Sequence, residues 1–439
     1  MKKNILLQIC ILCILSSIAS AQLFKSSKNG IKKTFFSADY ALFKTDVEDK
    51  TSRLEIYYQI FNAALNFDIV NKSYEAKYEL TIDLYKDNKK YDNYKHNQTV
   101  RVAKKAKTTS RSDYRTNQVN FLVEEGKYEV ILKLYDPVHN KEKIEKFKVK
   151  VKKYKNKRPI VSDIELVQGI STASENESVF DKGELQLIPS VRHKYGLIGK
   201  NSLYFYIELY QGSELAKDVR VETVLRHEAK GMLYRDSLTT FFANPIERQF
   251  RELSIDELRP GKYELIITLR GDRNKKIATK YKDFEILWTP RALIMYNYKV
   301  LVKQIEIVAS RDEVKLLKDK ETYEERLEAF NAYWDGQDPT PGTFENERKN
   351  EFYRRVAVAN HNFSYMFGNG WSSDRGRIYI MYGEPDQLDD YPIVPNQRPY
   401  QEWYYYQNSK YLKFVFVDQN EDGDYRLIYP SDGLYQRVD

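Results

Sequence analysis

The sequence predicts a multidomain chain: two tandem antiparallel β-sandwiches, followed by a C-terminal domain of mixed α+β structure. Two observations lead to this prediction. From about residue 22 to residue 289, short segments such as Leu54–Ile60 and Tyr78–Leu84 alternate apolar and polar side chains between polar turns. Many short strands joined by turns indicate sandwiches. After Pro290 the apolar residues take the spacing of helices.

A repeated pattern indicates that the two β regions share one fold. Gly126-Lys127-Tyr128-Glu129-Val130 recurs as Gly261-Lys262-Tyr263-Glu264-Leu265, and each copy is followed by an alternating strand, a turn and a last strand. A tyrosine at the start of a late strand is typical of the tyrosine corner of immunoglobulin-like and fibronectin-like sandwiches. We therefore expect such domains at residues 22–155 and 156–289, where they act most simply as spacers or scaffold.

The first 21 residues have the features of a secretory signal peptide. Two lysines precede the apolar run Ile5–Ile18, and Ala19-Ser20-Ala21 offers a cleavage site. The run is short for a transmembrane helix, and no later segment is apolar enough to span a bilayer. Both cysteines lie in this segment, so the mature chain has no thiol. We expect an exported protein that is periplasmic, or extracellular and associated with the outer membrane.

The charge balance argues against a nucleic-acid partner. Lys and Arg number 71 and Asp and Glu number 63, which gives a formal net charge of +8 over 439 residues. That is a mild bias for a chain of this length, whereas nucleic-acid binding needs a concentrated basic patch or stripe. Since export is also predicted, we expect no nucleic acid among the partners.

The C-terminal domain, residues 290–439, is expected to place helices before strands. The helices are expected at Val300–Lys318, Glu321–Trp334 and Phe344–Phe367. Their expected buried positions are Leu316, Tyr323, Leu327 and Phe330, and then Phe352, Val356, Ala359, Phe363 and Met366. The strands are expected near Gln401–Tyr406, Tyr411–Val417 and Asp424–Tyr429.

A block of glycine and polar residues connects the helices to the strands. It reads Gly370-Trp371-Ser372-Ser373-Asp374-Arg375-Gly376-Arg377. Glycine ends the preceding helix because it accepts positive φ, and Ser373 and Asp374 are typical turn or cap acceptors. From Arg377 to Tyr382 the residues alternate, which predicts a half-buried strand. Gly383-Glu384-Pro385-Asp386 then predicts a turn.

The block resembles the GWxTD domain, a family named for its Gly-Trp-x-Thr-Asp motif and found in bacterial envelope and secreted proteins. The resemblance extends over about the last third of the chain, by domain size. It includes Arg375-Gly376, the Gly-x-Pro-Asp turn, Glu402-Trp403-Tyr404 and Gly423-Asp424-Tyr425-Arg426-Leu427. Ser373 stands where the family has threonine, which keeps the hydroxyl and removes a methyl group. The resemblance implies an envelope location and no established activity.

Standard catalytic motifs are absent from the sequence. The histidines, His96, His139, His193, His227 and His361, are widely separated. There is no Gly-x-Ser-x-Gly elbow, P-loop or Gly-x-Gly-x-x-Gly motif. One alternative is a hydrolase of envelope glycan or peptide, in which Asp374 and Glu384 form an acid/base pair beside Arg375. Turn and cap chemistry explains the same residue types without any activity.

Calcium is a further alternative to the main expectation, which is that the protein has no cofactor. Asp418, Asn420, Asp422 and Asp424 alternate as ligands do in the first half of an EF-hand loop. However, the twelfth position is Tyr429 instead of Glu, and strands flank the loop where helices belong. A hairpin with an Asp-Gly turn explains the pattern equally well.

A dense run of aromatic residues follows the motif block. Alternation places Trp403 and Tyr405 on one face of a strand and Tyr404 and Tyr406 on the other. One face is expected in the core. The other face is either covered by the helices or exposed, in which case it can stack on sugar rings or bind a protein.

Together these patterns predict a non-enzymatic envelope protein. Its two sandwiches would present a GWxTD-like domain for binding to an envelope protein or glycan. The candidate binding residues are Trp371, Asp374, Arg375, Glu384 and Trp403. The hydrolase that uses Asp374 and Glu384 is the alternative, and a calcium-stabilised adhesin is a third hypothesis.

Overall fold

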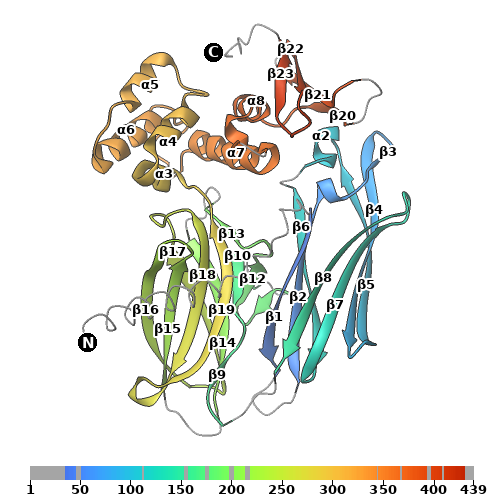
Figure 1. The fold of residues 1–439 in the computed structure, drawn as a ribbon, viewed down its shortest axis with the longest axis vertical. Helices are drawn as coiled ribbons and strands as arrows, with labels where there is room; N and C mark the ends of the chain where they lie inside the picture. Colours follow the sequence, from blue (N-terminus) through green and yellow to red (C-terminus); the bar gives the residue numbers. More distant parts are fainter. Residues whose placement is uncertain are drawn as a thin grey trace, which may run out of the picture. The chain divides into compact units, whose positions relative to one another are not determined.

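A computed structural model gives the fold of the chain (Figure 1). It describes residues 35–45, 51–110, 113–152, 157–173, 177–196, 202–212, 218–343, 345–365, 368–392, 397–407 and 410–430. The predicted signal peptide and Met366 lie outside the described residues. The described chain is mostly strands in several sheets, nearly all antiparallel, and its longer helices lie between residues 290 and 382.

The first β region, residues 35–152, contains two sheets around one core. One sheet has the order β1 (Phe36–Lys44), β2 (Ser52–Phe61), β6 (Tyr114–Val123). The other has the order β3 (Asp68–Val70), β4 (Ser73–Lys86), β7 (Gly126–Asp136), β8 (Lys141–Val151), with β5 (Lys89–Val102) also on β4. Alternate residues of both sheets, such as Ile56, Ile82 and Leu132, fill the core between them, which is β-sandwich-like packing. The short helix α2 (Lys105–Thr108) follows β5.

The second β region, residues 157–286, is built in the same way. One sheet contains β11 (Asp181–Lys182), β12 (Leu185–Pro189), β10 (Glu165–Thr172), β14 (Ser202–Tyr210) and β17 (Ile246–Ser254), with β9 (Ile160–Val161) on β14. The other contains β13 (Lys194–Tyr195), β19 (Lys276–Ile286), β18 (Gly261–Arg270), β15 (Asp218–His227) and β16 (Gly231–Phe241). Inward-facing residues of both sheets form one core cluster.

The tyrosines of the repeated Gly-Lys-Tyr-Glu pattern make equivalent contacts. Tyr128 is buried at the start of β7, and its hydroxyl donates to the carbonyl oxygen of Glu124 at 3.0 Å. Tyr263 is buried at the start of β18 and donates to the carbonyl oxygen of Arg259 at 2.6 Å. These are the backbone contacts that a tyrosine corner makes. The pattern therefore marks equivalent positions, while the immunoglobulin-like character of the regions stays a prediction.

The C-terminal region begins with capped helices. They are α3 (Pro290–Tyr296), α4 (Tyr298–Ile305), α5 (Arg311–Leu317), α6 (Tyr323–Asp335), α7 (Glu347–Phe363) and α8 (Asp374–Tyr382). Thr289 caps α3, and Ser310 and Thr322 form capping boxes with glutamates three residues later. A four-stranded meander follows: β20 (Gln387–Tyr391), β21 (Tyr400–Gln407), β22 (Lys410–Asp418) and β23 (Tyr425–Tyr429). None of the described helices is long and apolar enough to cross a membrane.

Two expectations for this region are wrong in detail. The single helix expected from Val300 to Lys318 is broken, because Ser310 starts a new helix and shifts the helical phase. Leu316, expected in the core, is therefore 71% exposed. The strand expected from Arg377 to Tyr382 is the second half of α8. Its short apolar run fits a strand as well as a buried helix, and the serine cap at Ser373 decides for the helix.

Most of the expected buried helix positions are confirmed. Phe330, Phe352, Val356 and Ala359 are buried, and Tyr323, Leu327 and Phe363 are half-buried against the same core. The three expected strands are also present, with β20 in addition. α7 and α8 cover one face of the meander, where Ile378 and Tyr379 pack against Trp403 and Phe416. On the other face of the meander, Asp389 of β20 pairs with Lys105 of α2.

Candidate functional site

The glycines and the serine of the motif block hold three segments in close contact. A 3₁₀ turn, η3 (Gly370–Ser372), lies between α7 and α8. A Cβ on Gly370 would collide with the carbonyl oxygen of Ala359 in α7, and one on Gly376 would collide with that of Gly370. Ser373 is buried; its hydroxyl donates to the Gly370 carbonyl oxygen at 2.8 Å and accepts from the Gly376 N–H at 3.1 Å. Serine stands here in place of the family's threonine, and its hydroxyl caps the N-terminus of α8.

Asp374 and Arg375 join α8 to the last two strands. Oδ2 of Asp374 accepts the backbone N–H of Leu427 at 2.9 Å. The buried guanidinium of Arg375 donates to the carbonyl oxygen of Gly423 at 3.0 Å and lies 3.9 Å from the ring centre of Tyr425. Charge-assisted hydrogen bonds and a desolvated cation–π contact are among the stronger polar contacts in proteins. Both side chains are thus engaged in tertiary structure.

The two tryptophans also pack inward. Trp371 is half-buried against the helical core, and its backbone N–H donates to Oδ1 of Asn360 at 3.1 Å. Trp403 is only 1% exposed, and its ring centre lies 5.4 Å from that of Phe363. Trp403 is therefore a core residue, and its ring does not belong to any surface that a large ligand can reach.

Glu384 faces the first β region. Its Oε2 lies 2.8 Å from Nζ of Lys107 in α2. Two neighbouring acids continue the contact: Asp386 pairs with Lys104 at 3.0 Å, and Asp389 pairs with Lys105. The backbone N–H of Tyr406 and the ammonium of Lys104 hold the pKa of Asp386 below its usual value. The turn Gly383–Asp386 is therefore an electrostatic contact between the C-terminal region and α2, which the sequence patterns did not single out.

Three of the predicted binding residues line one small cavity. Arg375, Glu384 and Trp403 contribute to it together with Thr109 and Ser110 of the first β region. Its volume is about 110 Å³. Ligand pockets typically have volumes of ~300–1,000 Å³. The cavity is a gap in the packing between two regions and is too small for a sugar chain or a peptide.

The geometry does not support the acid/base pair of the hydrolase hypothesis. Asp374 begins α8 and Glu384 follows its end. At ~1.5 Å per residue, the helix separates their α carbons by roughly 15 Å. Carboxyl pairs of glycoside hydrolases are ~5–9.5 Å apart. In addition, Asp374 holds the N–H of Leu427 while Glu384 holds Lys107, so the two carboxylates serve different contacts.

The loop proposed for calcium closes on itself. The two oxygens of Asp418 accept the backbone N–H groups of Asp422, at 3.2 Å, and Gly423, at 2.9 Å. Asp424 pairs with Arg426 at 2.5 Å, and Asn420 is exposed. Nowhere in the described ranges are three or more His, Cys, Asp or Glu side chains grouped as metal ligands. The loop is a hairpin turn stabilised by its first aspartate.

The outer face of the meander carries a group of tyrosines, and we call it the tyrosine face. It is formed by Tyr391, Tyr400, Tyr404, Tyr406 and Tyr411. Tyr391 and Tyr400 are stacked with ring centres 4.4 Å apart, while Tyr411 lies 5.8 Å from Tyr404 and 5.7 Å from Tyr406. Tyr406 and Tyr411 are each 56% exposed. The alternation predicted for Trp403 to Tyr406 is confirmed, with the tyrosine face on the solvent side.

A polar cluster lies in the middle of the tyrosine face. Glu402 pairs with Lys413 at 2.9 Å on the neighbouring strand, and the Tyr404 hydroxyl donates to Glu402 at 2.5 Å. This hydrogen bond raises the pKa of Tyr404 to about 12, so the hydroxyl stays protonated at neutral pH. Lys413 also lies 5.3 Å from the Tyr404 ring centre. The face thus offers aromatic rings and hydrogen-bonding groups side by side.

The sequence patterns missed Glu402, Lys413 and Tyr391 as part of this surface. The signal was present, because period-2 alternation in β21 places Glu402 on the same side as Tyr400 and Tyr404. The register that brings Lys413 and Tyr391 beside them is a tertiary property. A single sequence does not specify it.

Solved structures resemble the chain only distantly. Dimeric latent PorU from Porphyromonas gingivalis is 11% identical with a TM-score of 0.26, over 60% of this chain and 21% of that one. Red sea bream transglutaminase is 9% identical with a TM-score of 0.17, over 58% and 32%. The fibronectin(III)-like modules of Clostridium thermocellum CbhA are 11% identical with a TM-score of 0.16, over 54% and 85%. Scores this low carry no argument about function.

The sequence comparison is specific to the C-terminal region. No curated protein matches the chain. The sequence model of the GWxTD domain matches residues 286–436, which contain the capped turn at Ser373, the α8 contacts of Asp374 and Arg375, and the tyrosine face. Residues 286–436 are therefore a GWxTD domain, and the chain is a GWxTD domain-containing protein.

Proposed function

We propose that this chain is a non-enzymatic, exported cell-envelope protein whose tyrosine face binds an envelope glycan. In this proposal residues 1–21 are a cleaved signal peptide. Residues 22–155 and 156–289 are two immunoglobulin- or fibronectin-like domains that support the GWxTD domain at residues 290–439. The mature protein is periplasmic, or extracellular and associated with the outer membrane. The observation that carries the proposal is the set of tyrosines around Glu402 and Lys413, in which Tyr406 and Tyr411 are exposed and the other three are half-buried.

A sugar chain matches this surface in shape and chemistry. A pyranose ring has apolar C–H groups on its faces and hydroxyls around its edge, so it can stack on aromatic rings while hydrogen-bonding beside them. The tyrosines supply the rings, and Glu402, Lys413 and the tyrosine hydroxyls supply donors and acceptors. Exposed aromatic patches of this kind mark binding sites. The surface of a meander suits an extended chain, which can lie across several rings.

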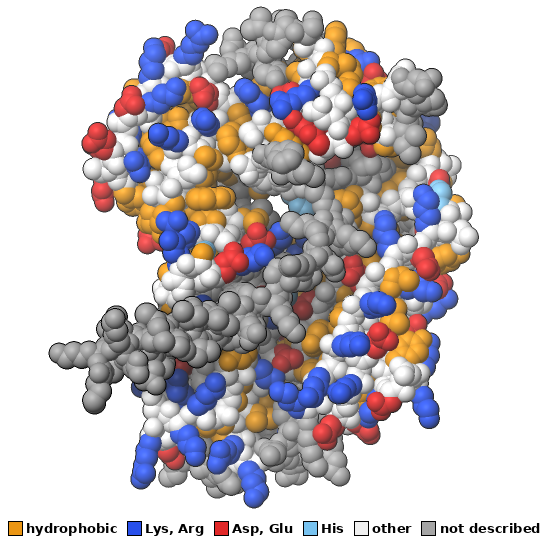
Figure 2. All heavy atoms as spheres, viewed as in Figure 1, with side chains coloured by type: hydrophobic (Ala, Val, Ile, Leu, Met, Phe, Trp, Pro, Cys, Tyr) orange, Lys and Arg blue, Asp and Glu red, His pale blue; other side chains and the backbone are white. Residues whose placement is uncertain are grey.

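The non-enzymatic part of the proposal rests on what the candidate acids already do. Asp374 binds a backbone N–H, Glu384 binds Lys107, and the helix α8 separates them. The acids on the tyrosine face are also paired, Glu402 with Lys413 and Asp389 with Lys105. Charge distribution supports the absence of nucleic acid, because basic and acidic side chains are interspersed on the face drawn in Figure 2.

The test is a co-sedimentation assay with insoluble envelope glycan, such as purified peptidoglycan, and the full chain. We expect the wild-type chain to sediment and a Tyr406→Ala/Tyr411→Ala double variant to bind at least roughly tenfold more weakly, since stacked rings dominate such contacts. Tyr281→Ala is a matched control, because Tyr281 is also 56% exposed but lies on β19 in the second β region. Equal sedimentation of the double variant and the control would contradict the tyrosine face as the site.

A protein ligand is the competing outcome. Tyrosine is also common among binding hot spots between proteins. If no glycan binds, but a cross-linked envelope protein is lost from the double variant and kept by Tyr281→Ala, the face is a protein-binding surface and the glycan proposal is wrong. Catalytic turnover of glycan that stops in a Glu384→Gln variant would contradict the non-enzymatic reading.

A further inference from the structure

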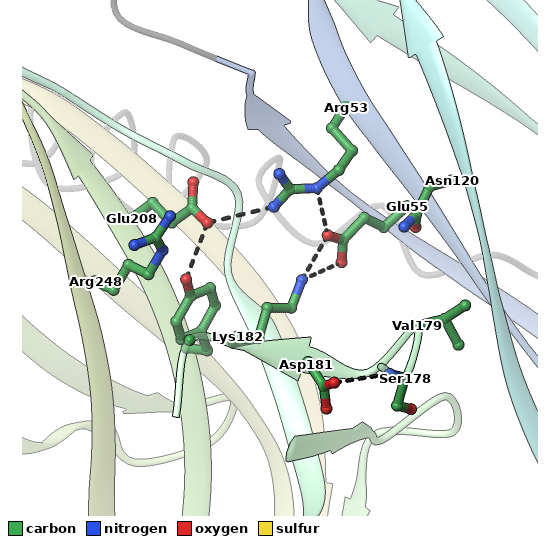
Figure 3. Close-up of a pocket in the computed structure, with 11 residues that line it drawn as sticks. Arg53, Glu55, Asn120, Ser178, Val179, Asp181, Lys182, Glu208 and Arg248 are labelled. Carbon is green, nitrogen blue, oxygen red and sulfur yellow. Dashed lines mark hydrogen bonds and ion pairs between the residues drawn. The ribbon is translucent and has the colours of Figure 1, made fainter. Parts of the chain in front are cut away.

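A second cavity lies between the two β regions, away from the GWxTD domain. Its volume is about 240 Å³, slightly below the ~300 Å³ lower limit of pockets for drug-sized ligands. Figure 3 shows its walls, which come from β2, β6 and the β11–β12 segment as well as from β14 and β17. The lining is mostly charged or polar: Arg53, Glu55, Asn120, Ser178, Asp181, Lys182, Tyr206, Glu208 and Arg248. Such a lining favours a small polar ligand over an apolar one.

The floor of the cavity is a rigid network of buried charges. Lys182 is buried, and its ammonium lies 2.5 and 2.6 Å from the two oxygens of Glu55 and 3.4 Å from Glu165. The ammonium also lies 4.5 Å from the ring centre of Phe43. Buried, paired charges of this kind hold their geometry because breaking either partner away leaves an uncompensated charge. The floor therefore offers a pre-formed site, which lowers the cost of binding.

The acidic side chains that line the cavity are already engaged. Glu55 accepts from Arg53 at 2.8 Å and from Lys182. Glu208 accepts from Arg53 at 3.3 Å and from two tyrosine hydroxyls at 2.9 and 2.5 Å. Asp181 accepts a backbone N–H at 2.7 Å and a glutamine amide at 3.4 Å. These carboxylates therefore have little capacity left to bind a cation or a further donor.

By contrast, two side chains at the rim of the cavity, Arg248 and Asn120, have hydrogen-bond donors available for a ligand. Arg248 stands directly opposite Glu208 in the register of β14 and β17, yet it makes no hydrogen bond or ion pair within the described residues. The reason is that Arg53 and the two tyrosines occupy the Glu208 carboxylate. No dashed line reaches Arg248 in Figure 3. Asn120 accepts through Oδ1 from Gln118 at 2.9 Å, which leaves its NH₂ group available toward the cavity it lines.

We propose that this cavity binds an acidic monosaccharide, whose carboxylate pairs with Arg248 and whose hydroxyls meet Asn120 and Ser178. A guanidinium is the preferred partner of a carboxylate, because its N–H groups match the two oxygens. Ser178 accepts from the N–H of Phe180 at 3.3 Å, so its hydroxyl hydrogen is available to a ligand. The volume accommodates a single sugar ring. This site is separate from the tyrosine face and does not depend on the function proposed for it.

The test is isothermal titration calorimetry on the full chain with glucuronic and galacturonic acids, and with glucose and inorganic phosphate as comparison ligands. We expect at least one uronic acid to bind, and glucose and phosphate each to bind at least roughly tenfold more weakly. Glucose that binds equally well would show that the carboxylate is not recognised. Phosphate that binds equally well would show that the sugar is not recognised. Either result, or no binding of either uronic acid, overturns the proposal.

Single-residue variants test whether the uronic acid binds in this cavity. Arg248→Ala should weaken uronic acid binding at least roughly tenfold. It should leave folding intact, since Arg248 is exposed and makes no hydrogen bond or ion pair with the described part of the chain. Arg220→Ala, which removes another exposed arginine of the second β region, should leave binding unchanged. The Tyr406→Ala/Tyr411→Ala variant should also bind the uronic acid normally. Undiminished binding by Arg248→Ala would overturn the assignment.

Discussion

Two parts of the GWxTD domain are rich in aromatic and charged residues, and they differ in what those residues do. In the motif block, Ser373, Asp374 and Arg375 direct their polar groups to backbone atoms of the same domain. On the tyrosine face, by contrast, Tyr406 and Tyr411 leave more than half of their surface to solvent. The difference teaches that the residues of the identifying motif serve internal contacts of the domain, whereas the binding that we propose falls to the less distinctive surface of the meander.

The largest effect should come from adding one methyl group inside the motif block. Gly376→Ala places a Cβ against the carbonyl oxygen of Gly370, so η3 or α8 must move. We expect a loss of at least ~3 kcal/mol in the free energy of unfolding, at the upper end for overpacking. Urea unfolding of the full chain measures it. Gly336→Ala is the matched control, because its Cβ would meet only ordinary contacts near 3.5 Å. A similar loss of stability in this control would show that the close contact at Gly376 is not the cause.

The buried charge network around Lys182, between the two β regions, should make stability depend on pH. Burial raises the pKa of Glu165 to about 7, against the ordinary value of 4.5, while Lys182 opposes the shift. The folded state then holds a proton that the unfolded state has released, so this contribution to stability is complete below pH ~4.5 and is lost as the pH rises to about 7. The shift corresponds to roughly 3 kcal/mol. In the Glu165→Gln variant the melting temperature should change less between pH ~4.5 and about 7 than in the wild type. An unchanged pH dependence of the melting temperature would contradict the raised pKa of Glu165.

A smaller effect is expected from Asp374. Asp374→Ala leaves the N–H of Leu427 without its acceptor, which should cost ~1–3 kcal/mol in the free energy of unfolding. Asp312→Ala removes an exposed carboxylate paired only with Lys315 and should change stability by less than ~0.5 kcal/mol. Chemical denaturation of both variants sharpens the comparison. If Asp374→Ala lowered the free energy of unfolding no more than the control does, the hydrogen bond from Leu427 to Asp374 would not stabilise the fold.

The smallest effect is expected where the GWxTD domain meets α2. Lys104, Lys105 and Lys107 pair with acids of the turn and of β20, but all three lysines are substantially exposed. Exposed pairs are worth ~0–1 kcal/mol and are screened by salt. Each lysine-to-alanine variant should therefore lower stability slightly at low salt and hardly at all at high salt. A large loss of unfolding free energy that does not depend on salt would show that these ion pairs stabilise the fold as strongly as the buried contacts of the motif block do.

Much of the fold follows from local pattern. Alternation in β4, β7, β18 and β21 is readable because a strand with one buried face repeats every two residues. The pattern failed at Arg377–Tyr382, where the five-residue apolar run Ile378–Tyr382 fits either a strand or a buried helix, although Ser373 and Gly383 supplied the cap signals. The domain boundaries and the export of the chain stay predictions.

The candidate site was less predictable than the fold. Distinctive residues such as Trp371, Asp374 and Trp403 drew attention because they carry unusual chemistry, yet the same chemistry serves packing once they are buried. The tyrosine face depends on the register between β20, β21 and β22, and the cavity beside Arg248 depends on contacts between two regions. Neither is encoded in local spacing, so both require the tertiary structure.

The most direct test of the central claim compares the two parts of the GWxTD domain in one glycan-binding assay. Tyr406→Ala/Tyr411→Ala and Glu384→Gln would be measured beside the wild-type full chain, with circular dichroism to confirm that each is folded. We predict that the tyrosine variant loses binding at least roughly tenfold and that Glu384→Gln retains it. Loss of binding in Glu384→Gln with normal binding by the tyrosine variant would contradict the account and return the site to the motif block.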